Sequence, residues 1–92
     1  MTFDPATVVK RSEGLIATEI DGEVVIVALE SGRYYGLDPV GSEIWRRLEA
    51  PKSLADLCTE LTGHFDGDPA TIERETLDFV REVAGRDILR RA

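Results

Sequence analysis

Residues 33–45 read Arg33-Tyr34-Tyr35-Gly36-Leu37-Asp38-Pro39-Val40-Gly41-Ser42-Glu43-Ile44-Trp45, and they join an aromatic segment directly to the start of a helix. Aromatic residues favour the half-buried surface of a β-sheet, so residues 33–37 are predicted to form a strand. Asp38 followed by Pro39 is typical of a helix N-terminus, with a capping carboxylate and a first-turn proline. If the strand lies at the edge of its sheet, its free backbone groups can accept an extended peptide as an additional strand.

Two further strands are predicted before this one. Residues 15–20 end at Asp21-Gly22, a dipeptide typical of two-residue hairpin turns. Residues 23–29 are apolar on both faces from Val24 onward, which is typical of a central strand. Ser31-Gly32 predicts a second turn. The three strands therefore form an antiparallel meander with the first and the third strand at its edges.

The hydrophobic spacing changes from two to about 3.6 residues after residue 38, which predicts three helices in the remaining chain. The first helix is expected to end at Ala50-Pro51. Ser53 is expected to cap the second helix, and Asp68-Pro69 to begin the third, which ends near Gly85. The order of three strands and three helices predicts an α+β fold.

The length of 92 residues predicts a single domain. We expect residues 1–13 to form a partly ordered N-terminal arm, with Val8 and Val9 packing on the body, and residues 14–92 to form the domain itself. Ile88 and Leu89 are expected to fold back onto it as a short apolar tail. No apolar run approaches the roughly 20 residues that cross a bilayer, and no secretory signal begins the chain, so no membrane association and a cytoplasmic location are expected.

The charge of the chain argues against nucleic acid as a partner. Acidic residues outnumber basic ones by 18 to 11, and the formal net charge is −7. A winged-helix DNA-binding regulator is the alternative function, but it needs a basic recognition helix. The charged residues of the predicted third helix include Glu73, Arg74, Glu75, Asp78, Arg81 and Glu82. Four of these six side chains are acidic, which disfavours binding of the helix to duplex DNA.

Catalytic and metal sites are not expected. Cys58 is the only cysteine and His64 the only histidine, and their separation of six positions places them on different faces of a helix. A zinc site needs three or four suitable ligands, and residues 66–68 lack the remaining ligands of a calcium loop. No phosphate-binding glycine loop or nucleophile elbow is present. We therefore expect a protein that is not an enzyme and that uses no cofactor.

An ordered set of short motifs runs from Val8 to Leu89. The motifs are Val8–Arg11, Asp21–Glu23, Gly32–Leu37, Val40-Gly41, Ile44-Trp45, Leu77–Val80 and Ile88-Leu89. With this set the chain resembles the PqqD-like family of winged-helix-like domains, also called precursor-peptide recognition elements (RREs). The chain departs from the family pattern at Arg86 and Asp87, which follow Gly85 where the family continues directly into apolar residues.

The resemblance implies that the chain binds the leader of a ribosomally made precursor peptide and delivers it to a tailoring enzyme. The leader would lie as an added strand along the third strand, in the cleft beside the third helix. The enzyme would be the leader peptidase and cyclase of a lasso-peptide pathway, which we prefer, or a radical SAM protein. A structural subunit of a larger enzyme is a further alternative, and a free edge can also pair with a second copy to form a homodimer.

The predicted peptide-binding residues lie on the third strand and the third helix. They are Arg33, Tyr34, Tyr35, Gly36 and Leu37 on the strand, and Arg74, Leu77, Asp78, Val80 and Arg81 on the helix. Alternation in the strand places Tyr35 and Leu37 toward the core and Tyr34 toward solvent. Leu77 either lines the cleft toward the strand or widens the core stripe. If it lines the cleft, the charged residues of the helix flank the groove and select among leader charges.

Overall fold

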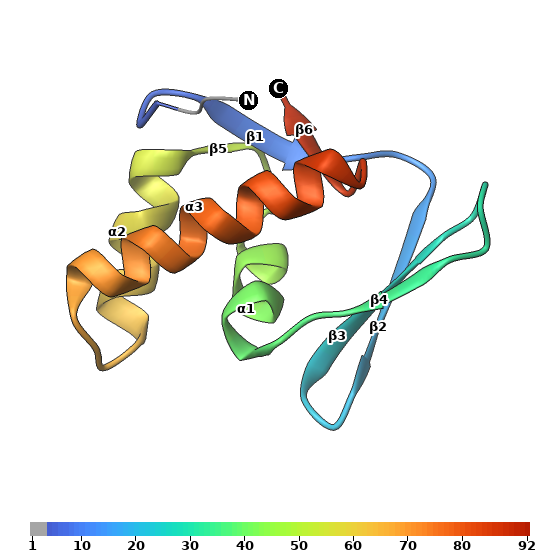
Figure 1. Cartoon of the computed structure of the whole chain (residues 1–92), viewed down its shortest axis with the longest axis horizontal. Coiled ribbons are helices and arrows are strands. Elements are labelled where there is room, and N and C mark those ends of the chain that lie inside the picture. The colour runs from blue at the N-terminus through green and yellow to red at the C-terminus, as the bar shows by residue number, and fades with distance from the viewer. Residues whose placement is uncertain (1–3) are drawn as a thin grey trace.

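In the computed structural model, which describes residues 4–92, three consecutive strands form an antiparallel meander (Figure 1). The strands β2 (Leu15–Ile20), β3 (Glu23–Ala28) and β4 (Tyr34–Gly36) pair in the order β2-β3-β4. Asp21 and Gly22 have φ angles of 53° and 83°, as a two-residue type I′ turn requires. The predicted meander and its central strand are confirmed, although β4 is two residues shorter than the predicted strand.

Three helices follow the meander, and each begins where the sequence predicts. They are α1 (Pro39–Arg47), α2 (Leu54–His64) and α3 (Pro69–Gly85). The side chains of Asp38, Ser53 and Asp68 each accept a hydrogen bond from a backbone N–H three residues later. The long helix α3 packs against both α1 and α2, and its C-terminal half approaches the meander (Figure 1).

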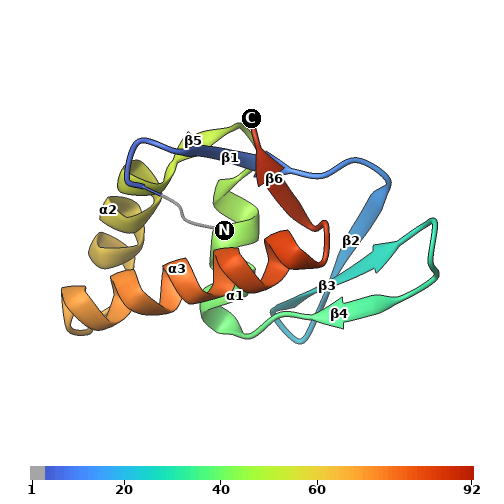
Figure 2. The ribbon, with the colours of Figure 1, turned by 45° about the horizontal axis from the view of Figure 1, so that its top comes forward.

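A second antiparallel sheet joins the two ends of the chain. It contains β5 (Lys52–Ser53), β1 (Val8–Arg11) and β6 (Leu89–Arg91) in the order β5-β1-β6 (Figure 2). Residues 8–11 are therefore a central strand, and the expectation of a partly ordered arm is wrong for them. Val9 is buried, whereas Val8 is 39% exposed, so only one of the two valines packs in the core. Residues 1–3 of the predicted arm lie outside the described residues.

One hydrophobic core lies between the helices and the two sheets. Its fully buried members include Val9, Val24, Ile26, Ile44, Leu48, Leu54, Leu57, Leu61, Val80, Ile88 and Leu89. The meander contributes Val24 and Ile26 to this core, and within residues 4–92 its opposite face carries the exposed side chains of Ile16, Ile20 and Tyr34. Within residues 4–92, no helix has the length and apolar character needed to span a membrane.

Candidate peptide-binding site

The strand β4 lies at an edge of the meander. Within residues 4–92 it pairs with β3 and with no other strand, because the N-terminal segment pairs in the second sheet instead. Leu37 N donates to Val24 O at 2.8 Å, and Ala28 N donates to Arg33 O at 2.8 Å. Since backbone groups of alternate residues point to opposite sides of a strand, the N–H and C=O groups of Tyr34 and Gly36 point away from β3. They form a short edge that can receive another strand.

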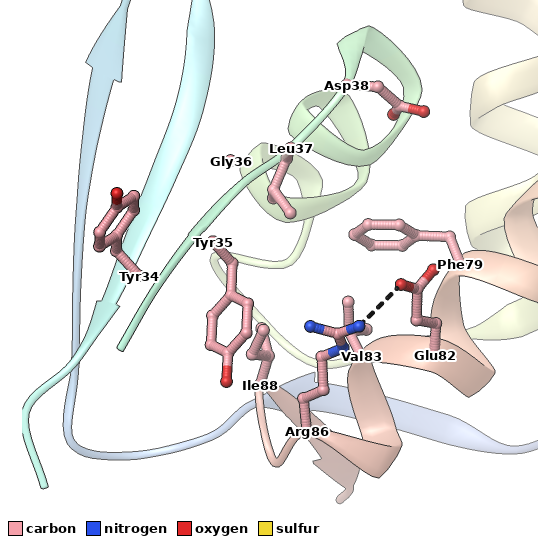
Figure 3. A pocket seen from close by; sticks show the side chains of 10 residues that line it. All are labelled: Tyr34, Tyr35, Gly36, Leu37, Asp38, Phe79, Glu82, Val83, Arg86 and Ile88. Atoms are coloured by element: carbon pink, nitrogen blue, oxygen red, sulfur yellow. Dashed lines mark hydrogen bonds and ion pairs between the residues drawn. The ribbon is translucent and has the colours of Figure 1, made fainter. Parts of the chain in front are cut away.

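A cleft of about 420 Å³ lies between this edge and the C-terminal half of α3 (Figure 3). It is lined by residues 34–38 on one side and by Phe79, Glu82, Val83, Arg86 and Ile88 on the other. Leu37, Val83 and Ile88 are buried and provide apolar surface. Tyr34, Glu82 and Arg86 are exposed. The cleft thus combines an apolar interior, a strand edge and polar groups.

The buried side chain of Ser42 fixes the end of β4. Its hydroxyl accepts a hydrogen bond from Val24 N at 2.9 Å and donates one to Leu37 O at 3.2 Å. One side chain of α1 therefore ties β3 to the residue that follows β4. Sequence reasoning did not identify this role, because a serine in a helix interior carries no pattern that indicates its burial.

A glycine of α1 sets the position of Phe79 in the cleft wall. A Cβ atom added to Gly41 would lie 2.5 Å from Phe79 Cε2, a distance too short for two carbon atoms. Gly41 N also donates to Asp38 Oδ1 at 2.7 Å in the helix cap. The absence of a side chain at residue 41 lets the phenyl ring rest directly on the first turn of α1.

The structure places four of the five predicted strand residues at the cleft. Tyr34, Tyr35, Gly36 and Leu37 all line it. Tyr34 is 75% exposed, Tyr35 is half-buried and Leu37 is buried, as the predicted alternation requires. Arg33 is exposed, does not line the cleft, and uses its backbone carbonyl in the pairing with β3.

The predicted helix residues lie elsewhere. Arg74, Leu77, Asp78 and Arg81 line a separate depression together with Ala70 and Glu73. Asp78 also borders a second depression that shares Asp38, Phe79 and Glu82 with the cleft. Val80 is fully buried in the core. None of the five predicted helix residues lines the cleft itself.

Of the two predicted placements of Leu77, the structure shows the one that widens the core stripe and not the one toward the strand, and the helix periodicity gives the reason. Leu77 and Phe79 are two positions apart, which is about 200° around an α-helix, so they face opposite sides. The residues that face β4 are Phe79, Glu82, Val83 and Arg86, which follow one another at spacings of three and one. Phe79 and Val83 also belong to the core face of α3, where Val83 is buried and Phe79 packs against the core. That face and the cleft wall are continuous, because Val83 belongs to both.

The reactive side chains lie outside the cleft. Cys58 lines a different depression with Leu54, Ala55 and Leu77, between α2 and α3. Burial, assisted by the Glu73 carboxylate, raises the pKa of its thiol, which favours the protonated form over the nucleophilic thiolate. Within residues 4–92, no three His, Cys, Asp or Glu side chains are grouped so that they could hold a metal ion.

Residues 23–89 match the family model of Coenzyme PQQ synthesis protein D (PqqD). The chain belongs to the PqqD family. The matched segment contains β3, β4 and all three helices of this PqqD-family chain, and so includes both walls of the cleft. No curated protein matches the chain.

Solved structures agree with this assignment. TbiB1, solved in complex with the TbiA(beta) leader peptide, is 38% identical, with a TM-score of 0.78 over 87% of this chain and 93% of TbiB1. A lasso peptide synthetase B1 complexed with its leader peptide shares the fold at 21% identity (TM-score 0.77, 89% of this chain, 96% of that chain). The PqqD truncation of Methylobacterium extorquens PqqCD, a stand-alone RRE, shares it at 22% identity (TM-score 0.80, 98% and 96%).

Proposed function

We propose that this PqqD-family chain is a non-catalytic adaptor that binds the leader of a ribosomal precursor peptide and presents it to a maturation enzyme. The observation that carries the proposal is the outer edge of β4, which no strand of the described residues occupies, beside an apolar cleft. The similarity to TbiB1, whose structure contains a leader peptide, supports the same function.

The leader would add to the meander as a fourth strand. Tyr34 and Gly36 would exchange backbone hydrogen bonds with it, since their N–H and C=O groups point outward. The leader residue opposite Tyr35 would then point to the same face as Tyr35, into the cleft. Its neighbours would point to the open face, where Tyr34 lies. An apolar leader side chain fits the buried surface formed by Leu37, Val83 and Ile88.

The energy of such a complex is sufficient for specific binding. Each backbone hydrogen bond contributes about 0.5–1.5 kcal/mol net, and each buried apolar side chain adds about 1.5–3 kcal/mol. Ordering the leader costs about 2–5 kcal/mol or more. With four hydrogen bonds and two buried side chains, the upper ends of these ranges leave about 7–10 kcal/mol, which brackets the roughly 8 kcal/mol of a micromolar complex. Backbone pairing would tolerate many sequences, and the cleft would select among them.

The recipient enzyme is proposed from the family resemblance. We place the leader peptidase and cyclase of a lasso-peptide pathway first and a radical SAM enzyme second. Leader cleavage or modification by each candidate enzyme, measured with and without this chain, distinguishes them. The correct enzyme should act on its precursor much faster when the chain is present.

An NMR titration with the leader of a precursor encoded beside this gene tests the adaptor function. We expect amide shifts in β4 and in the C-terminal half of α3. Gly36→Pro should weaken binding because it removes an outward N–H, and an edge strand tolerates proline there. A Cβ at residue 36 would meet nothing within 4 Å, and the proline Cδ would take the outward direction of the lost N–H.

Ala17→Pro is the matched control. Ala17 lies on β2, at the opposite edge of the meander, and the pairing of β2 with β3 directs its N–H outward as well. This variant should bind the leader like the unmodified protein. Equal losses in the two proline variants, or leader-induced shifts confined to another surface, would refute binding at β4.

A further inference from the structure

Arg86 lies at the end of α3, and its side chain turns back across the cleft. The guanidinium carbon is 5.3 Å from the centroid of the Tyr35 ring, and Nη2 is 3.4 Å from Glu82 Oε1. Figure 3 shows the guanidinium between the Tyr35 ring and the Glu82 carboxylate. The backbone N–H of Arg86 closes the helix by donating to Val83 O at 3.2 Å. A substitution of the side chain therefore leaves the helix cap in place.

Within residues 4–92, Arg86 is the only cation among the residues that line the cleft. The other charged side chains there are Asp38, whose carboxylate caps α1, and Glu82. The remaining lining residues are aromatic, apolar or glycine. Inside the cleft, a peptide that lies along β4 therefore meets one positive group, next to Tyr35, whereas the exposed Arg33 precedes β4 and lies outside the cleft.

The present partners of Arg86 hold it weakly. The side chains of Arg86 and Glu82 are 50% and 64% exposed, and exposed pairs at this spacing contribute little to stability. A peptide strand over the cleft would exclude water from the guanidinium, which strengthens any pairing with a carboxylate. The planar guanidinium can hold a carboxylate through two parallel hydrogen bonds.

We propose that Arg86 selects leaders that carry an Asp or Glu at an inward-facing position beside Tyr35, two residues along the leader from the apolar side chain that fills the cleft. This inference rests on the proposed function and names the class of leader. The selection also works by exclusion, because a Lys or Arg at that position would face the guanidinium in a water-poor cleft. The selection depends on the contact with Arg86 and not on the charge of the whole protein. The net charge of −7 repels an acidic peptide.

Selection from a random 12-residue peptide library displayed on phage tests this inference. The baits are the unmodified protein, Arg86→Gln, and Arg81→Gln as a matched control. Arg81 lies on the same helix and also pairs with a carboxylate, Asp78 at 3.7 Å, but it does not line the cleft. Peptides that shift the β4 amides are then synthesised with Glu and with Gln at the acidic position.

Replacing Glu by Gln in the peptide should weaken binding about tenfold for the unmodified protein and for Arg81→Gln. Arg86→Gln should bind both peptides equally, and Arg86→Glu should instead prefer a peptide with Lys. If Arg86→Gln keeps the preference for Glu, or if β4-binding peptides carry no acidic residue, the inference is wrong and the adaptor function stands. If no selected peptide shifts the β4 amides, the adaptor function fails, and this inference fails with it.

Discussion

At the scale of single residues, Ser42 connects the cleft to the core. It is fully buried, and its hydroxyl serves Val24 N and Leu37 O at once. A buried polar group that loses its partner costs about 1–3 kcal/mol. The strand edge therefore depends on a side chain that no peptide would touch.

Ser42→Ala should lower the free energy of unfolding by about 1–3 kcal/mol, because it leaves a buried N–H and a buried C=O without this partner. Urea denaturation measures the change. Ser31→Ala is the control, since its hydroxyl accepts from Arg33 N at 3.2 Å in an exposed turn. That variant should change stability by less than about 0.5 kcal/mol. Similar losses in the two variants would mean that the buried hydroxyl contributes nothing specific.

Tyr34→Ala should weaken leader binding by about 1–2 kcal/mol while changing stability little, because Tyr34 is 75% exposed on the open face beside the edge. Ile16→Ala is the control on the same face, at the far strand β2 and 54% exposed, and it should not alter binding. Leu37→Ala should instead cost about 2–5 kcal/mol of stability as a cavity mutation. Calorimetric titration and thermal unfolding separate the two effects. A Tyr34→Ala variant that loses both equally would place Tyr34 in the core.

At the scale of elements, the local signals in the sequence were sufficient for the meander and the helices. Asp21-Gly22 specifies its own turn, and Asp38, Ser53 and Asp68 cap helices through neighbours three residues away. The second sheet has no comparable local signal. β1 pairs with residues 43–45 positions away in β5 and 78–82 positions away in β6, and β5 contains two residues. Pairing over such distances depends on the tertiary fold, which periodicity does not describe.

The two walls of the cleft also differ in whether local sequence signals predict them. The strand wall follows from period-two alternation, so Tyr34, Tyr35 and Leu37 could be placed from the sequence. The helix wall requires knowing which part of the wide apolar face of α3 turns toward β4. The contact between Gly41 and Phe79 sets the orientation of this face. Because it joins residues of two helices, the periodicity of α3 alone does not predict it.

Val9→Ala tests whether the second sheet supports the fold. Val9 is 1% exposed in the centre of that sheet, so its truncation should lower the free energy of unfolding by roughly 2 kcal/mol. Val8→Ala, one residue earlier and 39% exposed, should change it by less than about 0.5 kcal/mol. Urea denaturation measures both. Leader affinity should be unchanged in the two variants, because β1 lies outside the β4 sheet. A Val9→Ala variant with full stability would mean that β1 is dispensable.

At the scale of the whole molecule, the net charge and the short β4 edge both disfavour association of the protein with a second copy of itself. A net charge of −7 on a 10.2 kDa protein repels duplex nucleic acid and also repels a second copy of the chain. A leader peptide is slender enough to enter the cleft, whereas a second copy must bring its own helices to the same edge. The short strand β4, with three residues, offers little surface for a stable dimer.

The protein should therefore sediment as a monomer at 0.15 M salt. The alternative is a dimer in which the β4 edges of two copies pair. Sedimentation equilibrium at 0.05 M and 0.5 M salt measures this, because salt screens the repulsion between copies. Gly36→Pro is the informative comparison, since it blocks the β4 edge alone. It should sediment like the unmodified protein. A dimer that forms in the unmodified protein and is lost in Gly36→Pro would contradict the prediction. The β4 edge would then be occupied by a second copy, and the leader would have to displace that copy before it could bind.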